Sequence, residues 1–421
     1  MGYESNGYAG APAGGTPMEL RLADSLTGRV RSIRPSHGRR TGLYVCGPTV
    51  YDAAHVGHAR TYLFFDVARR FLEAEGYRVR HVMNVTDLED KIDQRAAALG
   101  ISSRALARGE ERRFFRDLGA FGNLPPTYRP RASEYIPDMI GLARALERTG
   151  RVRRQDGEWR YEAPDRPEGE NFATTADLAR HAVVEPDHPF GEASCGERSF
   201  VVWKQLAPPL ISWPSPWGRG APGWHLQCFA MASRLVGVPV DLHGGGRDLV
   251  YPHHFAENEI SLTLRGRPFA PVFLHAGLVL QDGSKMSKSV GNLVPLREAL
   301  AAIGAAALRW YLLERPFRER FPWSEEGAAR AREELDLLRA TVRGWLGSSR
   351  PSGLGASRAM RLARTVRRAL AQGLATDTVV RELRAFAAEV GSRTGGVGRG
   401  EASAARTALA AVEQRLGIAL R

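Results

Sequence analysis

Two histidines and two lysines stand at spacings that suit the chemistry of phosphate groups. His55 and His58 flank Gly57 in the sequence HVGH, and two imidazoles beside a glycine offer a triphosphate both donors and a close backbone. Lys285 and Lys288 lie in a loop bounded by glycines, where two ammonium groups can neutralise a pyrophosphate leaving group. Either motif alone is also typical of a solvated turn. These lysines are, however, half of the four in the chain, which favours a functional role.

Four other residues could form a metal site. Cys46 is expected at the end of the first strand, Cys228 lies in GWHLQC, and His253 precedes Glu257 by four positions. If YPHHFAENE begins a helix, that spacing puts both side chains on one face, and two thiolates, an imidazole and a carboxylate are ligands that zinc accepts. Glu259 is an alternative carboxylate. The competing interpretation is two structural cysteines and a His–Glu pair on a helix surface.

The sequence HGGGRD at 243–248 indicates a turn at the end of a strand, beneath a nucleotide. Its glycines, Gly245 among them, would let the backbone approach the ligand, and the Asp248 carboxylate could accept hydrogen bonds from ribose hydroxyls. A glycine triplet alone is weak support for such a site.

Together these motifs resemble the two signature sequences of class I aminoacyl-tRNA synthetases. The surrounding sequence is most similar to the cysteinyl-tRNA synthetase family, over residues 19–330, in the segments LYVCGPTVYDAAHVGHAR, NVTDLEDKI, PGWHLQC, DLHGGGRDLVYPHH and GLVLQDGSKMSKSVGN. The resemblance implies a cysteine–tRNA ligase, which activates L-cysteine with ATP to cysteinyl-adenylate and transfers it to tRNA(Cys). A sister family with the same catalytic core, the cysteine ligase of mycothiol biosynthesis, joins cysteine to an amino sugar.

The resemblance also implies a role for each candidate residue. The implied catalytic residues are His55, His58, Lys285 and Lys288; the ATP-binding residues are Gly57, Gly245, Asp248 and Lys288; the substrate-binding residues are Thr49 and Trp224; and the zinc ligands are Cys46, Cys228, His253 and Glu257. For Trp224, packing in the core is an equal alternative to packing against the substrate. The implied cofactors are one Zn²⁺ per chain and ATP with Mg²⁺. The sequence departs from the family's usual His-His-Glu-Asn-Glu, because Phe255-Ala256 lies between the histidines and the glutamates.

Zinc would explain how cysteine is selected. A substrate thiol can bind zinc as a thiolate, and the harder hydroxyl of serine does not match that bond. A site that rewards one polar group can reject its isostere by about 10⁴-fold or more, which makes editing unnecessary. The third cysteine, Cys195, lies in a polar segment and is expected to play no part.

The elements that must position these residues follow from hydrophobic periodicity. A strand at 43–46, a helix at 59–75 and a strand at 78–84 form a βαβ crossover, and strands are also expected at 239–243 and 272–279. The predicted fold class is α/β, a doubly wound parallel sheet of the Rossmann type with an insertion, followed by a C-terminal helical bundle. The expected divisions are a disordered tail at 1–17, the first half of the catalytic domain at 18–133, a connective insertion at 134–210, the second half at 211–270, the KMSKS-loop and stem-contact region at 271–330, and the bundle at 331–421, truncated relative to the full-length family.

The charge of the 421-residue chain is uneven. The formal net charge is +13, and residues 331–421 hold 16 Arg against 8 acidic residues. A basic region permits a polyanionic partner. Arg361, Arg364, Arg367 and Arg368 lie at helical spacing and are one candidate face for tRNA. Simple solvation of an exposed helix by arginine is an equal alternative.

Composition excludes other classes of protein. No apolar stretch reaches membrane-spanning length, the first residues fit neither a signal nor a transit peptide, and three cysteines are too few for a disulfide framework. We therefore expect a cytoplasmic protein that acts in protein biosynthesis, makes no membrane contact and is a monomer.

The sequence leaves the acceptor of the cysteinyl group open. CGPTVYD and VGHAR favour tRNA, whereas the expected lack of a small anticodon-binding domain favours an amino sugar or another small amine. A non-catalytic RNA-binding paralogue is a third interpretation. The intact pairs of histidines and lysines argue against it, because a degenerate site would have lost some of them.

Overall fold

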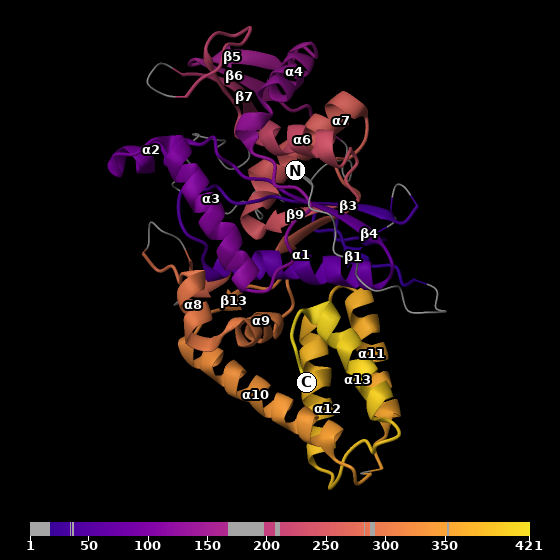
Figure 1. Cartoon of the computed structure of the whole chain (residues 1–421). Coiled ribbons are helices and arrows are strands. Elements are labelled where there is room, and N and C mark those ends of the chain that lie inside the picture. Colours follow the sequence, from indigo (N-terminus) through magenta and orange to yellow (C-terminus); the bar gives the residue numbers. More distant parts are fainter. Residues whose placement is uncertain are drawn as a thin grey trace.

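The computed structural model describes residues 17–33, 35, 38–166, 198–206, 211–281, 283–286, 291–351 and 353–421. Cys195, Lys288 and nearly all of the tail expected at 1–17 lie outside these ranges. Figure 1 shows an antiparallel sheet at one end of the molecule, a parallel sheet in the middle and a helical bundle at the other end. None of the described helices combines the length and the apolar character needed to cross a membrane.

The parallel sheet carries the predicted crossover. Its strands are β3 (Arg40–Val45), β4 (Arg78–Met83), β9 (Leu242–Gly246) and β10 (Phe273–Ala276), all parallel, in the order β10-β9-β3-β4. Helix α1 (Val56–Ala74) connects β3 to β4, so the βαβ unit and the α/β fold class are confirmed. The strand expected at 239–243 begins only at Leu242, because the Val240 amide donates to the Phe269 carbonyl instead of to a strand of the sheet.

Helix α1 lies at the centre of the molecule, between the parallel sheet and the bundle (Figure 1). Apolar side chains are buried along nearly its whole length, including Leu63, Phe64 and Phe71, as expected of a helix that is covered on more than one face. It ends before Gly76, which adopts a φ of 87°. The residues at its N-terminus are therefore held by a rigid, buried element.

The insertion has its own sheet. After α2 (Asp90–Ala98), α3 (Ser103–Ala120), a short turn (Ala132–Glu134) and α4 (Ile136–Glu147) come the antiparallel strands β5 (Val152–Gln155), β6 (Glu158–Glu162), β7 (Ser199–Gln205) and β8 (Gly220–Pro222). Side chains of this sheet, such as Tyr161, Phe200 and Trp203, share a second core with α4 and α6 (Trp224–Leu235). Because β8 pairs with β7, the sheet extends beyond residue 210.

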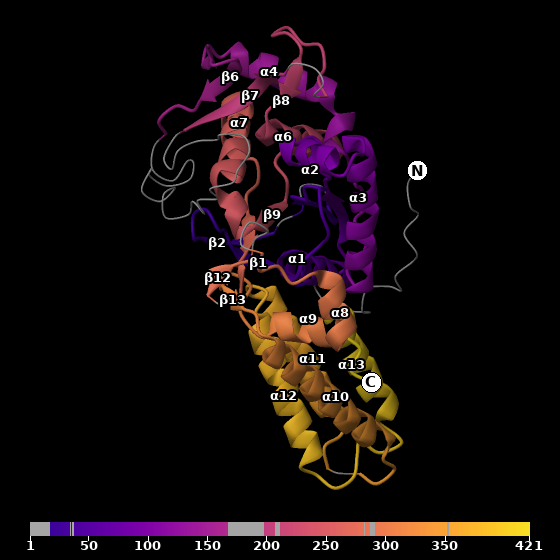
Figure 2. The ribbon, with the colours of Figure 1, turned by 90° about the vertical axis from the view of Figure 1, so that its left-hand side faces the viewer.

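The remaining elements complete the part of the chain before residue 325, which we call the catalytic unit, and the helical bundle that follows it. They are the hairpin β1 (Arg21–Ala23) and β2 (Val30–Ser32), the turns Arg247–Leu249 and Val250–His254, α7 (Phe255–Arg265), the small sheet of β11 (Val279–Gln281), β12 (Ser284–Lys285) and β13 (Phe321–Pro322), α8 (Leu296–Ile303), α9 (Ala305–Leu313), α10 (Glu325–Gly347), α11 (Ala356–Ala371), α12 (Thr376–Gly391) and α13 (Ala402–Leu416). Figure 2 shows α10 to α13 side by side as they extend away from the sheet. The predicted C-terminal bundle is thus confirmed.

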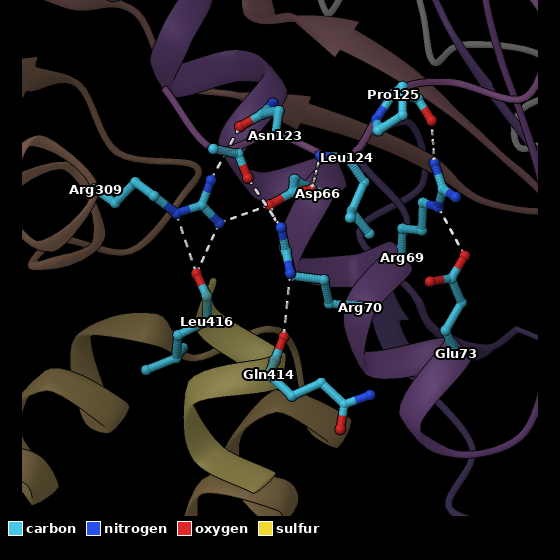
Figure 3. Close-up of polar contacts among 11 residues, drawn as sticks. Asp66, Arg69, Arg70, Glu73, Asn123, Leu124, Pro125, Arg309, Gln414 and Leu416 are labelled. Carbon is cyan, nitrogen blue, oxygen red and sulfur yellow. Dashed lines mark hydrogen bonds and ion pairs between the residues drawn. The ribbon is translucent and has the colours of Figure 1, made fainter. Parts of the chain in front are cut away.

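A buried ion pair joins the bundle to the catalytic unit (Figure 3). The Arg309 guanidinium of α9 lies 2.6 Å from the Asp66 carboxylate of α1 and donates to the Leu416 carbonyl at 2.7 Å, where α13 ends. The Asn123 side chain accepts a further hydrogen bond from Arg309 at 3.0 Å. Asp66 and Arg309 are almost completely buried, so the charges and their hydrogen bonds fix the position of α13 against α1.

A second junction between the bundle and the catalytic unit uses one of the four arginines that were candidates for a basic face. The Glu75 carboxylate accepts from Arg367 at 2.5 Å and from Arg415 at 3.0 Å. Arg367 therefore faces the catalytic unit. Of the four arginines predicted to form a basic face on α11, the other three are exposed: Arg361, Arg364 and Arg368.

Candidate functional site

The HVGH turn forms the N-terminus of α1. The His55 Nδ1 accepts from the Gly57 amide at 3.1 Å and the His58 Nδ1 accepts from the His55 amide at 3.3 Å, so the two side chains cap the helix reciprocally. Their rings stack, with centroids 3.8 Å apart. A Cβ at position 57 would lie 2.8 Å from the His55 ring, which explains the glycine between them.

The capping bonds determine where each imidazole carries its proton. In both rings Nδ1 accepts a hydrogen bond from a backbone amide, so the neutral ring holds its proton on Nε2. Both histidines therefore present an Nε2–H donor at the positive end of a helix dipole. This arrangement suits a polyphosphate.

The two flanks of the lysine motif are attached to different elements. On the downstream side, the Val56 amide donates to Val294 at 3.0 Å and the Leu296 amide donates to Ala54 at 2.9 Å. On the upstream side, the Lys285 backbone lies in β12, which pairs with β11. The downstream end of the motif is thus bonded to the histidine turn, and the upstream end belongs to the hairpin of β11 and β12. The Lys285 side chain and Lys288 lie outside what the structure describes.

The glycine turn lies where the parallel strands end. Gly244 to Gly246 finish β9, and a Cβ at Gly244 would collide with the Leu274 carbonyl of β10. A Cβ at Gly245 would lie 2.7 Å from the Leu249 side chain. Asp248 follows in the next turn, and burial raises the pKa of its carboxyl. Ligands of open α/β sheets bind at this edge, so Gly245 and Asp248 lie where a nucleotide is expected.

The predicted metal ligands come together in the interior of the protein. The ligand atoms of Cys46, His253, His254 and Glu257 all lie within 4.8 Å of one another. Cys228 is outside that group and adjoins it through Cys46, with the two sulfur atoms 3.8 Å apart. Two sulfurs each about 2.3 Å from a tetrahedral zinc ion would be about 3.8 Å apart. Glu257 Oε1 is buried and has no hydrogen-bond partner among the described residues. These residues therefore fit a zinc ion.

The two candidate carboxylates are in different environments. Glu257 Oε1 lies 3.6 Å from the Nε2 atom of His253, as the i, i+4 spacing predicts. Glu259 instead accepts hydrogen bonds from the Nε and Nη2 atoms of Arg166 at 2.7 to 3.0 Å. The additional Phe255-Ala256 lies directly after the irregular helical turn Val250–His254, and α7 continues regularly from it. The geometry therefore favours Glu257 over Glu259 as a metal ligand.

Four histidines near this cluster were not predicted from the sequence: His225, His243, His254 and His275. His243 Nε2 lies 2.8 Å from Glu257 Oε2, and its Nδ1 lies 3.0 Å from the Tyr44 carbonyl. The His254 ring belongs to the same group of possible ligands, and its Nδ1 contacts His275 at 2.6 Å. His225 Nδ1 contacts His253 Nδ1 at 3.0 Å, which leaves His253 Nε2 toward Glu257. The sequence features that could have indicated these histidines are the doublet His253-His254 and His243 at the start of HGGG.

The protonation of the cluster depends on a cation. Burial, followed by the neighbouring Cys228 and Glu257, raises the pKa of the Cys46 thiol well above its usual value. Burial and the surrounding imidazoles hold the pKa of His254 well below its usual value, so that ring stays neutral. Two thiolates beside a carboxylate need a positive charge among them.

The two predicted substrate residues lie beside the cluster and at the strand ends. The Trp224 indole, at the start of α6, stacks on the His253 ring with centroids 4.3 Å apart. Thr49 is half-buried just beyond β3 and pairs with Thr86 beyond β4.

Comparison with known proteins agrees with this geometry. Residues 32–333 match the family model of the catalytic domain of class I (C) tRNA synthetases. The cysteine–tRNA ligase of Anaeromyxobacter sp. (strain K) is 41% identical over 333 residues, which are 77% of this chain and 68% of that protein. The cysteine–tRNA ligase of Thermococcus gammatolerans is 39% identical over 329 residues, with the same coverage of both proteins.

Solved structures support the fold. The methionyl-tRNA synthetase of Mycobacterium tuberculosis, bound to methionyl-adenylate, has a TM-score of 0.61 and 20% identity over 84% of each chain. The Agrobacterium radiobacter K84 agnB2 LeuRS in a ternary complex has a TM-score of 0.63 and 12% identity, over 91% of this chain and 84% of that one.

Proposed function

The chain belongs to the cysteinyl-tRNA synthetase family of class I aminoacyl-tRNA synthetases, and we propose that it activates L-cysteine with ATP and transfers the cysteinyl group to tRNA(Cys). The observation that supports this proposal most directly is that the histidine turn and the metal cluster both follow the end of β3, at one edge of the sheet. The capped histidines His55 and His58 lie at the N-terminus of α1, and the sulfur and imidazole cluster lies around Cys46, at the end of β3. The compartment we propose is the cytoplasm, where a reducing environment keeps such thiols free.

Activation would proceed by positioning and electrostatics. The carboxylate of cysteine attacks the α-phosphorus of ATP, and pyrophosphate leaves. The Nε2–H donors of His55 and His58 would bind phosphate oxygens whose charge increases in the transition state, while Lys285 and Lys288 would neutralise the pyrophosphate. Gly245 would allow the nucleotide close to the backbone of β9. Mg²⁺ would accompany the ATP.

Cysteine would be recognised at the metal cluster. Cys46, Cys228, His253 and Glu257 would hold one zinc ion per chain. When bound, zinc supplies a soft Lewis-acid site that prefers a thiol sulfur to a hydroxyl oxygen. The Trp224 ring, stacked on His253, would cover one side of the substrate, and Thr49 would lie near its other end.

The acceptor would approach from the side of the bundle. The exposed arginines Arg361, Arg364 and Arg368 would contact phosphates of tRNA, which makes binding dependent on salt. The net charge of +13 supports a polyanionic partner. We propose that the enzyme acts as a monomer.

Cysteine-dependent exchange of ATP with labelled pyrophosphate tests the first step. The exchange should need cysteine and no tRNA, and serine should not replace cysteine. Absence of exchange in the zinc-loaded protein would refute the proposal.

Acceptor trials test the second step. Labelled cysteine should be transferred to total tRNA and not to amino sugars. Exchange with cysteine followed by transfer to an amino sugar alone would reassign the enzyme to the cysteine ligases of small amines.

The metal is tested with a conservative variant of one ligand. Zinc measured by elemental analysis should be about one per chain in the wild-type protein and should be lost in Cys228→Ser, because the hydroxyl is a poor ligand for zinc. The same variant should discriminate less well against serine. A zinc-free preparation with full exchange activity would contradict the metal assignment.

A further inference from the structure

Arg60 is a buried cation in the helix that begins with the histidine turn. It lies two positions after His58 and its side chain is inaccessible to solvent. No carboxylate forms an ion pair with it among the residues that the structure describes, and burial, followed by repulsion from Arg315, lowers its pKa to about 9. A charged group at this depth is costly unless other groups replace its hydration.

Backbone carbonyls at the end of α9 and in the loop that follows it replace that hydration. The Arg60 Nη1 donates to Leu312 at 2.7 Å, and its Nη2 donates to Pro316 and Glu319, each at 3.0 Å. The guanidinium also lies over the rings of Phe64 and Phe321, at 5.1 and 4.7 Å from their centroids. The planar fork of arginine can reach three carbonyls at once, which the single ammonium of lysine cannot do with the same geometry.

The loop held by Arg60 is packed against Gly277 and Leu278, the two residues that precede β11. The Phe317 carbonyl accepts from the Gly277 amide at 2.7 Å, and a Cβ at Gly277 would collide with the Glu319 carbonyl. Immediately after the loop, the Phe321 amide donates to Leu278 at 2.8 Å. A continuous series of contacts therefore leads from Arg60 through the loop to β11, and β11 pairs with the β12 backbone that contains Lys285.

We propose that Arg60 is a positioning residue for amino-acid activation, because it fixes the strand that begins the lysine motif relative to the histidine turn. The downstream flank has its own backbone bonds to the turn at Val56 and Leu296. The upstream flank is joined to α1 through the Arg60 fork and through apolar contacts such as that between Phe64 and Phe317, whose centroids are 5.6 Å apart. Apolar contacts resist sliding less than directional hydrogen bonds do. The activity part of this inference rests on the proposed function.

The test compares Arg60→Lys with Arg309→Lys. Arg309 is equally buried and also contacts α1, but it holds the bundle instead of β11, so it is a matched control for the loss of a buried guanidinium. Hydrogen exchange of the Gly277 and Phe321 amides reports on the junction at β11 and needs no substrate. ATP–pyrophosphate exchange reports on activation.

We expect Arg60→Lys to speed the hydrogen exchange of these two amides at least tenfold. It should also lower the kcat of ATP–pyrophosphate exchange at least tenfold, while the KM for cysteine stays within twofold of wild type. Arg309→Lys should lower the melting temperature by a similar amount and change neither quantity by more than twofold. Gly277→Ala pushes the Glu319 carbonyl away without removing any charge, so it should give the same results as Arg60→Lys. If Arg60→Lys does not fold, Gly277→Ala takes its place in the test.

The inference is overturned if the amides at β11 stay protected in Arg60→Lys and in Gly277→Ala. It is also overturned if activity in Arg60→Lys and Arg309→Lys falls in proportion to the loss of melting temperature. A wild-type protein without cysteine-dependent exchange would instead refute the proposed function, and the amide exchange alone would then decide the role of Arg60 in fixing β11.

Discussion

His81 should make the parallel sheet sensitive to acid. This β4 side chain is 4% exposed, and neither ring nitrogen has a hydrogen-bond partner among the described residues. Burial, followed by repulsion from Arg69, lowers the pKa of His81 to about 3, whereas a histidine in an unfolded chain has a pKa of about 6.5. Between these values the unfolded state binds more protons than the folded state, so stability decreases as the pH falls below about 6.5.

The two pKa values set the size of the effect. Linkage gives a loss of free energy of unfolding of about 0.2 kcal/mol at pH 7, about 2 kcal/mol at pH 5 and about 3 kcal/mol at pH 4. His81→Leu removes the titration, keeps a similar volume and sacrifices no side-chain hydrogen bond within the described structure. Relative to wild type, this variant should therefore gain about 2 kcal/mol between pH 7.5 and pH 5.

Urea denaturation at pH 7.5, 6 and 5 measures this difference, because other titrating groups contribute equally to both proteins. His81→Gln is the control: a buried amide without partners lowers stability at every pH, but it should give the same pH dependence as His81→Leu. If wild type and His81→Leu lose stability in parallel between pH 7.5 and pH 5, burial does not keep His81 neutral and the reasoning fails.

Three further tests address the site and the acceptor. Glu257→Gln should lose most of its zinc by elemental analysis whereas Glu259→Gln should keep it, and equal zinc contents would contradict the choice of ligand. Lys288→Ala should lower cysteine-dependent exchange by about 10²- to 10³-fold, as the loss of one oxyanion donor does; an unchanged rate would exclude its assigned role. Replacing Arg361 and Arg364 by Gln should reduce the slope of log affinity for tRNA against log salt by about 2 without altering exchange, and an unchanged slope would show that this face does not bind tRNA.

The sequence predicted the elements whose signals are local. The βαβ unit was predictable because an apolar strand, a helix and a second strand follow each other within 50 residues, each with its own periodicity. The ligand atoms of Cys46 and Cys228 meet across 182 positions, and only the motifs around them could indicate that meeting. The i, i+4 spacing of His253 and Glu257 was informative because the irregular helical turn that holds His253 continues directly into α7, which holds Glu257.

Other features depend on long-range packing that no local pattern encodes. Helical spacing put Arg367 on a basic face, but Glu75, 292 positions away, binds it. His243 and Arg60 belong to familiar motifs, yet their contacts depend on which way a buried side chain points. The strands β6 and β7 were also missed as a sheet, because the polar residues of β6 that remain partly exposed read as irregular structure.

The junction at Asp66 has a consequence for the order in which the protein can fold during synthesis. Arg309 is separated from Asp66 by 243 positions and from Leu416 by 107. A ribosome releases Asp66 together with Arg70, whose guanidinium lies 2.8 Å from it, long before Arg309 and the carbonyl at the end of α13 exist. In the nascent chain this carboxylate therefore has only part of its final set of partners. Gly417, with a φ of 65°, ends α13 where any Cβ would meet the Arg309 guanidinium. Final packing of α1 is therefore expected to be a late event that waits for α13.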